Sequence, residues 1–121
     1  MAYGNIASFS GTAVQPRTAV DWETDFAASP AVPKIAIFDI NEGDKPPSVA
    51  QKLADDFNKR NKPSFCATPN GSDVVFTAQD SKYKVSEMRF KINNGGTKNL
   101  PGDGAGVPVG NTGLSVKNAN G

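Results

Sequence analysis

Two segments of the sequence contain residue types that bind phosphate groups or metal ions. Gly102–Gly106 has the glycine content of a phosphate-binding loop, but such a loop needs a preceding strand and a helix that begins directly after it. Pro108 and Gly110 follow instead, so no helix can begin there. Asp39–Asp44 has the oxygen density of a calcium loop, yet Gly43 stands one position early and the bidentate glutamate is missing. We expect a flexible segment in the first case and a strand-to-helix turn in the second.

The residues that could act as a nucleophile or as a general acid or base lack the second residue that such catalysis needs. The chain contains no histidine, which removes the most common general base and metal ligand. Cys66 therefore has no activating imidazole, and because it lies in an expected strand we interpret it as a small buried apolar residue. Asp55 and Asp56 are adjacent, so on a helix they point about 100° apart and cannot act as an acid–base pair. We predict that the protein is not an enzyme and has no cofactor.

The charge balance argues against nucleic acid and anionic membranes as partners. Thirteen Lys and Arg residues against twelve Asp and Glu residues give a net charge of +1. The basic cluster of Lys59, Arg60 and Lys62 lies at the end of an expected helix, where cations complement the helix dipole. No apolar run approaches the length of a membrane span, and Met1–Phe9 lacks the pattern of a signal peptide. We expect a protein that is made in the cytoplasm of its host cell.

The middle of the chain contains the clearest secondary-structure patterns. Lys34–Ile40 is an apolar run bounded by a proline and a turn, which predicts a mostly buried strand. Apolar residues in Ser48–Arg60 share one helix face, and Ser48 with Gln51 has the pattern of a capping box. We therefore expect a strand followed by an amphipathic helix.

Three further strands are expected after the helix. Ser64–Thr68 and Asp73–Ala78 flank Asn70-Gly71, which is a strong hairpin signal because both residues tolerate a positive φ angle. In Ser86–Ile92 apolar and charged residues alternate, which is typical of a strand with one buried face. Together with the preceding strand and helix, these strands predict an α+β fold in which one helix covers a small, mostly antiparallel sheet.

Composition divides the chain into three parts. Residues 1–33 contain only four charged residues, and their apolar side chains have no sustained period, although Thr18–Trp22 fits a short strand. Residues 94–121 contain eight of the twelve glycines and three charged residues. We interpret 1–33 and 94–121 as extended, low-charge arms that dock on a partner surface, and 34–93 as the compact core domain.

The part from Lys34 to Asn93 also resembles an element of a known family. A Gly43-Asp44 turn, a helix with regularly spaced alanines, the strand Phe65–Thr68, a glycine turn and the strand Val74–Gln79 occur in this order. This order resembles the small inserted domain of contractile tail sheath proteins from tailed bacteriophages. The resemblance covers about half of the chain and includes no catalytic signature. It implies a structural role in a virus particle.

From this resemblance and from the arms, we predict a non-enzymatic structural protein of a bacteriophage particle, located in the virion. We favour a small capsid decoration, or cement, protein that forms a homo-oligomer and bridges major capsid subunits or other virion subunits. Such a protein stabilises the shell by binding the assembled lattice rather than its separate subunits. Buried aromatic and apolar side chains dominate interfaces of this kind. The expected anchors in the arms are Phe9, Trp22, Phe26, Leu100, Val107 and Val109.

Two alternative functions are open at this point. A tail component, whether a sheath-like, tube or baseplate subunit, should polymerise alone into rings or tubes, whereas a decoration protein should stay a small oligomer until capsid is present. A surface module that binds carbohydrate or protein needs an exposed aromatic cluster. Its candidate aromatic residues, Tyr3, Trp22 and Tyr83, are far apart in the sequence.

Overall fold

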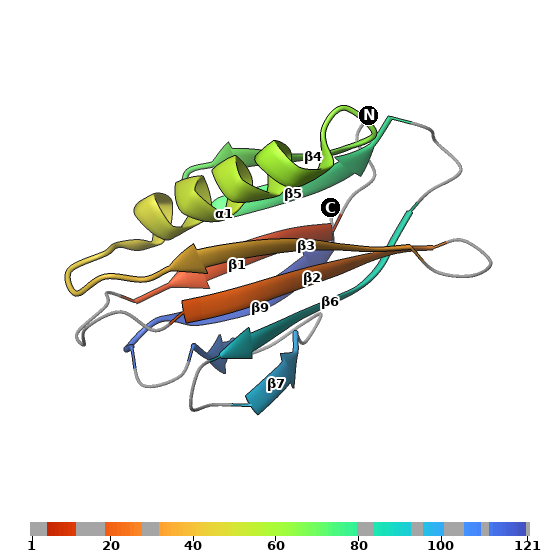
Figure 1. Ribbon diagram of the computed structural model, residues 1–121. Helices are drawn as coiled ribbons and strands as arrows, with labels where there is room; N and C mark the ends of the chain where they lie inside the picture. The colour runs from red at the N-terminus through yellow and green to blue at the C-terminus, as the bar shows by residue number, and fades with distance from the viewer. Residues whose placement is uncertain are drawn as a thin grey trace.

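The computed structural model describes residues 5–11, 19–27, 32–79, 84–92, 96–100, 106–109 and 112–120. These residues form nine β-strands and one α-helix, which Figure 1 shows. In chain order they are β1 (Asn5–Ser10), β2 (Ala19–Ala27), β3 (Val32–Asp39), α1 (Pro46–Asn61), β4 (Phe65–Asn70), β5 (Asp73–Ala78), β6 (Lys84–Ile92), β7 (Gly96–Asn99), β8 (Val107–Pro108) and β9 (Ser115–Asn120). The predicted α+β class is confirmed.

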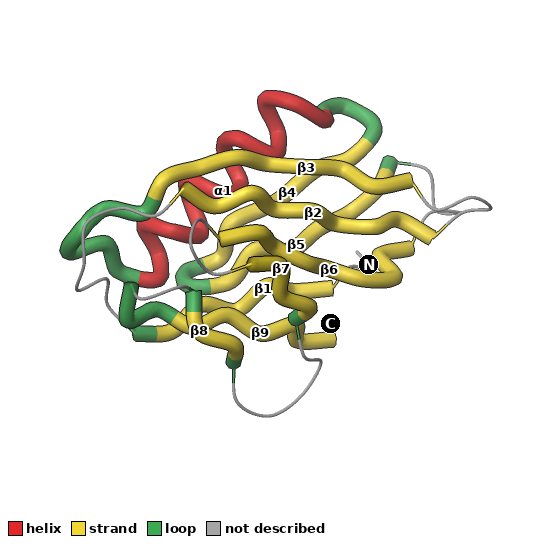
Figure 2. Tube along the Cα trace, turned by 60° about the horizontal axis from the view of Figure 1, so that its bottom comes forward, coloured by secondary structure: helices red, strands yellow, loops and turns green. Residues whose placement is uncertain are grey.

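The strands form two sheets in which every neighbouring pair is antiparallel. The five-stranded sheet has the order β4, β5, β1, β9, β8, and the four-stranded sheet has the order β3, β2, β6, β7. The helix α1 lies along one side of the molecule, next to β3 of one sheet and β4 of the other (Figure 1). In the turned view of Figure 2, β3 and β2 can be followed side by side along the four-stranded sheet.

Each element predicted in the middle of the chain is present, with small differences at its ends. The helix begins at Pro46, two residues before the predicted start at Ser48, and its N-cap residue makes no side-chain hydrogen bond. The expected capping box is therefore wrong, because prolines occupy the first turn, where a missing N–H costs nothing. The predicted hairpin is confirmed, since Asn70 is in register with Asp73 and Gly71 has a φ angle of +60°.

An aromatic cluster joins the two sheets and the helix. Trp22 of β2 stacks on Phe76 of β5, with ring centroids 5.8 Å apart, and on its cross-strand neighbour Phe90 of β6, at 6.1 Å. Phe57 of α1 meets Phe76 edge-on at 5.0 Å, and Phe9 of β1 lies 6.2 Å from Trp22. Each such pair contributes about 0.5–1.5 kcal/mol beyond the burial of its apolar area. The cluster therefore holds the two sheets and the helix together.

The described parts of residues 1–33 and 94–121 are not arms outside a core domain. The strand β1 is the middle strand of the five-stranded sheet, and β2 is an inner strand of the other sheet. Ala7, Leu114 and Val116 are buried in the same core as the middle segment. Without these strands the apolar sides of β5 and β6 would face water, at a cost of about 25 cal/mol for each Å² of apolar surface. The expected division of the chain at residues 33 and 93 is therefore wrong.

Candidate interaction surface

The exposed apolar residues of the described structure lie on one side of β3. Side chains alternate along this strand, so that Ala36 and Phe38 are buried while Ile35 and Ile37 are 44% and 43% exposed. Among the residues that the structure describes, these are the large apolar side chains that remain exposed. The strand expected at 34–40 is therefore not mostly buried, because only one of its faces is covered.

A shallow pocket of about 160 Å³ opens on this side of the four-stranded sheet. One of its walls is aliphatic and comes from β3, and the other is cationic and comes from β6. We call this surface the outer face. Its exposed or half-exposed side chains are Ile35 and Ile37 from β3, Glu23 from β2, Arg89 and Lys91 from β6, and Thr97 from β7.

The charges on the outer face are partly neutralised within the sheet. Glu23 and Arg89 are in register on adjacent strands and form an ion pair. Lys91 is exposed, and within the described ranges it has no ion-pair partner. A half-exposed ion pair contributes only about 0–1 kcal/mol to stability. The residues that line the pocket therefore include two isoleucines beside three charged side chains, Glu23, Arg89 and Lys91, whose charges sum to +1.

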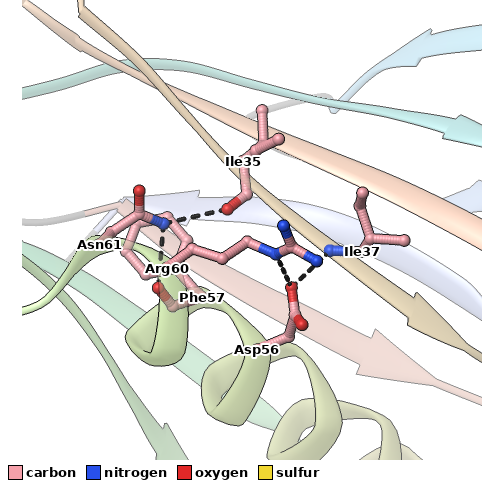
Figure 3. Close-up of polar contacts among 6 residues, drawn as sticks. All are labelled: Ile35, Ile37, Asp56, Phe57, Arg60 and Asn61. Atoms are coloured by element: carbon pink, nitrogen blue, oxygen red, sulfur yellow. Dashed lines mark hydrogen bonds and ion pairs between the residues drawn. The ribbon is translucent and has the colours of Figure 1, made fainter.

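Side chains of the helix bond to the β3 backbone behind the two isoleucines. Asp56 Oδ2 accepts a hydrogen bond from the backbone N–H of Ile37 at 2.7 Å, and Asn61 Nδ2 donates one to the carbonyl oxygen of Ile35 at 3.0 Å (Figure 3). Along one edge of an antiparallel strand, every second residue directs its backbone N–H and C=O away from the neighbouring strand. Ile35 and Ile37 direct these groups away from β2 and towards the helix. The backbone of the isoleucines is thus fixed while their side chains stay exposed.

The two helix side chains are held in place by bonds within α1. Asp56 Oδ2 also accepts a hydrogen bond from Arg60 Nε at 2.7 Å, in an i,i+4 ion pair. The amide of Asn61 also donates to the carbonyl oxygen of Phe57 at 2.9 Å (Figure 3). Because these contacts are already formed, a partner that binds the outer face has little ordering entropy to overcome on this side.

The Asp39–Asp44 segment is the strand-to-helix turn that the sequence predicts. Gly43 has a φ angle of +89°, and Asp44 Oδ2 accepts hydrogen bonds from the Asn41 N–H at 2.8 Å and from Lys52 Nζ at 2.5 Å. Partial burial raises the pKa of Asp44, but the hydrogen bonds from Lys52 and Asn41 and the Lys52 charge together hold this pKa below its ordinary value of 3.8. The described residues contain no group of three or more side chains that could hold a metal ion.

The structure places most of the predicted anchor residues inside the protein. Four of them are between 1% and 8% exposed: Phe9, Trp22, Leu100 and Val109. Val107 packs partly buried against the same core, and the side chain of Phe26 lies outside the described residues. Apolar residues without a regular period indicate that these side chains are buried. They do not indicate whether the chain itself or a partner covers them. Here the chain's own strands cover the four core residues, so their expected contact with a partner is wrong.

The remaining chemical candidates are not brought together. Cys66 is half-buried on β4, with its thiol 3.8 Å from the carbonyl oxygen of Pro63. Residues 102–105 of the glycine-rich segment lie outside the described residues. So do Tyr3 and Tyr83, and Trp22 is buried, so the described surface offers none of the aromatic residues expected of a carbohydrate-binding module.

Sequence reasoning did not single out Ile35 and Ile37, because the run from 34 to 40 is apolar at positions of both faces. No model of a known protein family matches the chain, and no curated protein matches it. In the part of the chain that the structure describes, no helix is long and apolar enough to cross a bilayer. The geometry of the outer face is therefore the main guide to function.

Proposed function

We propose that the protein is a non-enzymatic structural subunit of a bacteriophage particle, and more specifically a small capsid decoration protein that acts as a homo-oligomer. The observation that carries this proposal is the outer face, where Ile35 and Ile37 are exposed beside Arg89 and Lys91. An apolar centre with a charged rim is typical of a protein–protein interface. Single exposed isoleucines are common, but two on one strand next to a pocket favour a contact surface.

In this proposal the major capsid subunits bind a preformed surface and not extended arms. Ordering an arm costs about 1–2 kcal/mol of backbone entropy per residue, and a rigid sheet avoids this cost. Each single contact is small, so the attachment depends on many copies bound to one lattice. Because the protein binds the assembled lattice and not free subunits, it shifts the equilibrium towards the complete shell.

A tail component is the second candidate, and a specific observation favours it. The succession of β3, the turn at Gly43, α1, β4, the turn at Gly71 and β5 has the order on which the resemblance to the inserted domain of tail sheath proteins rests. The β4 and β5 strands of this unit continue into the five-stranded sheet through β1. The segment from β3 to β5 therefore fits a subunit that attaches to a phage tail as well as one that attaches to a head.

Quantitative mass spectrometry of gradient-purified phage particles tests the proposal. Heads and tails are separated after disruption, and the copy number of the protein is measured in each fraction. A fixed copy number on heads agrees with a decoration protein, whereas recovery with tails alone supports the second candidate. Absence from both fractions would contradict a role in the virion.

Rebinding of purified protein to particles that lack it then locates the contact surface. Ile37→Glu places a charge in the centre of the outer face and should lower the occupancy at least about tenfold. Thr68→Glu is the matched control, because Thr68 is exposed on β4, away from the outer face. Equal occupancy of the two variants and the wild type would show that the outer face is not the contact.

A further inference from the structure

The two open sheets have four edge strands, which are β3 and β7 in one sheet and β4 and β8 in the other. An edge strand presents N–H and C=O groups that can pair with a strand of another chain, and proteins usually block them. Along an edge strand, residues that bond to the neighbouring strand alternate with residues whose backbone N–H and C=O groups point out of the sheet. We call the second kind outward residues, and the register identifies them.

The edge of β3 is blocked by the helix. Of its outward residues, Ile35 and Ile37 bond to Asn61 and Asp56 as described above. The carbonyl oxygen of Asp39, the next outward residue, accepts a hydrogen bond from Lys52 Nζ at 3.3 Å. The preceding outward residue in this alternation is Pro33, which has no N–H to offer.

The edge of β4, like that of β3, is blocked by a side chain of the helix and by a proline. The side-chain amide of Asn58 on α1 donates to the carbonyl oxygen of Ala67 at 2.7 Å and accepts from its N–H at 2.8 Å. The next outward residue is Pro69, two positions further along the strand. Both groups of Ala67 are therefore occupied, and its neighbour lacks a donor.

The edge of β8 is short and also contains a proline. The Val109 N–H donates to the carbonyl oxygen of Leu114 at 2.8 Å, so Val109 and Val107 direct their backbone groups towards β9. Pro108, between them, therefore faces outwards without an N–H. Three of the four edges thus carry a proline at an outward position.

Within the described residues of β7, Gly96–Asn99, the edge has neither kind of block. The Leu100 N–H donates to the carbonyl oxygen of Met88 at 3.1 Å, so the alternation directs the N–H and C=O groups of Thr97 and Asn99 away from β6. The side chains of Thr97, Lys98 and Asn99 are all exposed. No other described residue bonds to the outward backbone groups of Thr97 or Asn99.

We propose that β7 accepts an extended acidic segment of another protein as an additional strand of the four-stranded sheet. Main-chain hydrogen bonds to Thr97 and Asn99 provide affinity, as in other cases of strand addition. The charge of the partner follows from exposed Lys98 on the edge strand itself. Exposed Lys91 of β6, in register with Thr97, adds a positive charge on the opposite face of the sheet. This proposal goes beyond the virion role and does not depend on it.

A second copy of the chain fits this edge less well than an acidic segment does. The two-fold register that pairs Thr97 with Asn99 of the second copy also sets Lys98 opposite the same lysine. Like charges directly opposite each other on paired strands are destabilising. A carboxylate at that position converts the repulsion into attraction.

Peptide binding to the full chain tests this inference without phage particles. One probe is a short acetylated and amidated peptide in which glutamate alternates with valine, and the matched probe has lysine in place of glutamate. Fluorescence anisotropy measures affinity, and amide hydrogen exchange measures protection of Thr97 and Asn99. We expect the glutamate peptide to bind at least about tenfold more tightly than the lysine peptide, and to slow exchange at both amides.

Three variants separate strand addition from simple charge attraction. Asn99→Pro removes an outward N–H and no bond within the sheet, so it should weaken binding of the glutamate peptide at least about tenfold, whereas Asn99→Val should not. Lys98→Glu should make the chain bind the lysine peptide more tightly than the glutamate peptide. This variant still tests the proposal if Asn99→Pro does not fold. Unchanged binding by Asn99→Pro, equal affinity for both peptides or no binding would overturn the proposal. Self-association of the chain that Asn99→Pro abolishes would overturn it in favour of a second copy.

Discussion

The side-chain amide of Asn58 forms two hydrogen bonds with the backbone of Ala67, one in each direction, and so takes the place of a neighbouring strand. Asn58→Ala leaves both groups of Ala67 without this partner. We expect the free energy of unfolding to fall by about 2 kcal/mol, as each lost bond of this kind costs about 1 kcal/mol. Urea unfolding measures the loss. Asn58→Asp keeps the acceptor but sets a carboxylate oxygen against the carbonyl oxygen of Ala67, so its loss should be at least as large as that of alanine, and wild-type stability of Asn58→Asp would contradict the paired geometry.

Replacement of Trp22 tests whether this residue belongs to the core or to an interface. Because Trp22 is buried and stacks on both Phe76 and Phe90, Trp22→Ala should lower the free energy of unfolding by about 3–5 kcal/mol. The matched change Ile37→Ala, on the outer face, should alter stability by no more than about 0.5 kcal/mol. Thermal unfolding of the isolated protein distinguishes the two residues. A stable Trp22→Ala protein would show that the aromatic cluster does not hold the layers together.

Two glycines with similar φ angles separate backbone strain from steric contact. Gly11 and Gly43 have φ angles of +84° and +89°. A Cβ at Gly11 would collide with the carbonyl oxygen of Gly113, whereas a Cβ at Gly43 would meet nothing within 4 Å. Gly43→Ala should therefore cost about 1 kcal/mol, and Gly11→Ala about 3 kcal/mol or more. Equal midpoints of denaturation for the two variants would argue against the close approach of Gly11 and Gly113.

The lowered pKa of Asp44 predicts a specific pH dependence. The ionised carboxylate stabilises the folded state, so its contribution is present above the ordinary pKa of 3.8 and is lost as the pH falls through the lower folded pKa. Asp44→Asn should lower stability by about 1 kcal/mol at neutral pH, and the difference from wild type should shrink in strong acid. Denaturant unfolding at a series of pH values measures it. Lys52→Met should give a loss of similar size at neutral pH, and a loss by Asp44→Asn that persists unchanged in acid would refute the ion pair.

Local patterns located the middle of the fold because each depends on residues that are close in sequence. The helix follows from the spacing of apolar residues in 48–60. The hairpin follows from the positive φ angle of Gly71, although Asn70 ends β4 and the loop residues are Gly71 and Ser72. The strands β1, β7, β8 and β9 have short or mixed patterns, and their partners are distant in sequence. Their existence is decided by pairing and burial, which no local window of the sequence contains.

The outer face shows the same limit at the level of single residues. In β3, apolar residues occupy the positions of both faces, so the run does not reveal that Ile35 and Ile37 are exposed. The deciding signal is in β2, where Asp21, Glu23 and Asp25 stand at alternate positions. That signal applies to β3 only once the two strands are known to be paired. In the same way, Pro108 can be recognised as an edge residue only when its register with β9 is known.

The pairing of β1 with β9 determines when during synthesis the five-stranded sheet can form. Asn5 is in register with Asn120, and Ser10 with Ser115. During synthesis β1 leaves the ribosome first, but one of its two neighbours is complete only after Ser115–Asn120 has followed. The central strand of the five-stranded sheet therefore stays unpaired on one side for almost the whole of translation of these 121 residues. Since contacts between distant segments form slowly, the five-stranded sheet is expected to close late, only after β9 has been made.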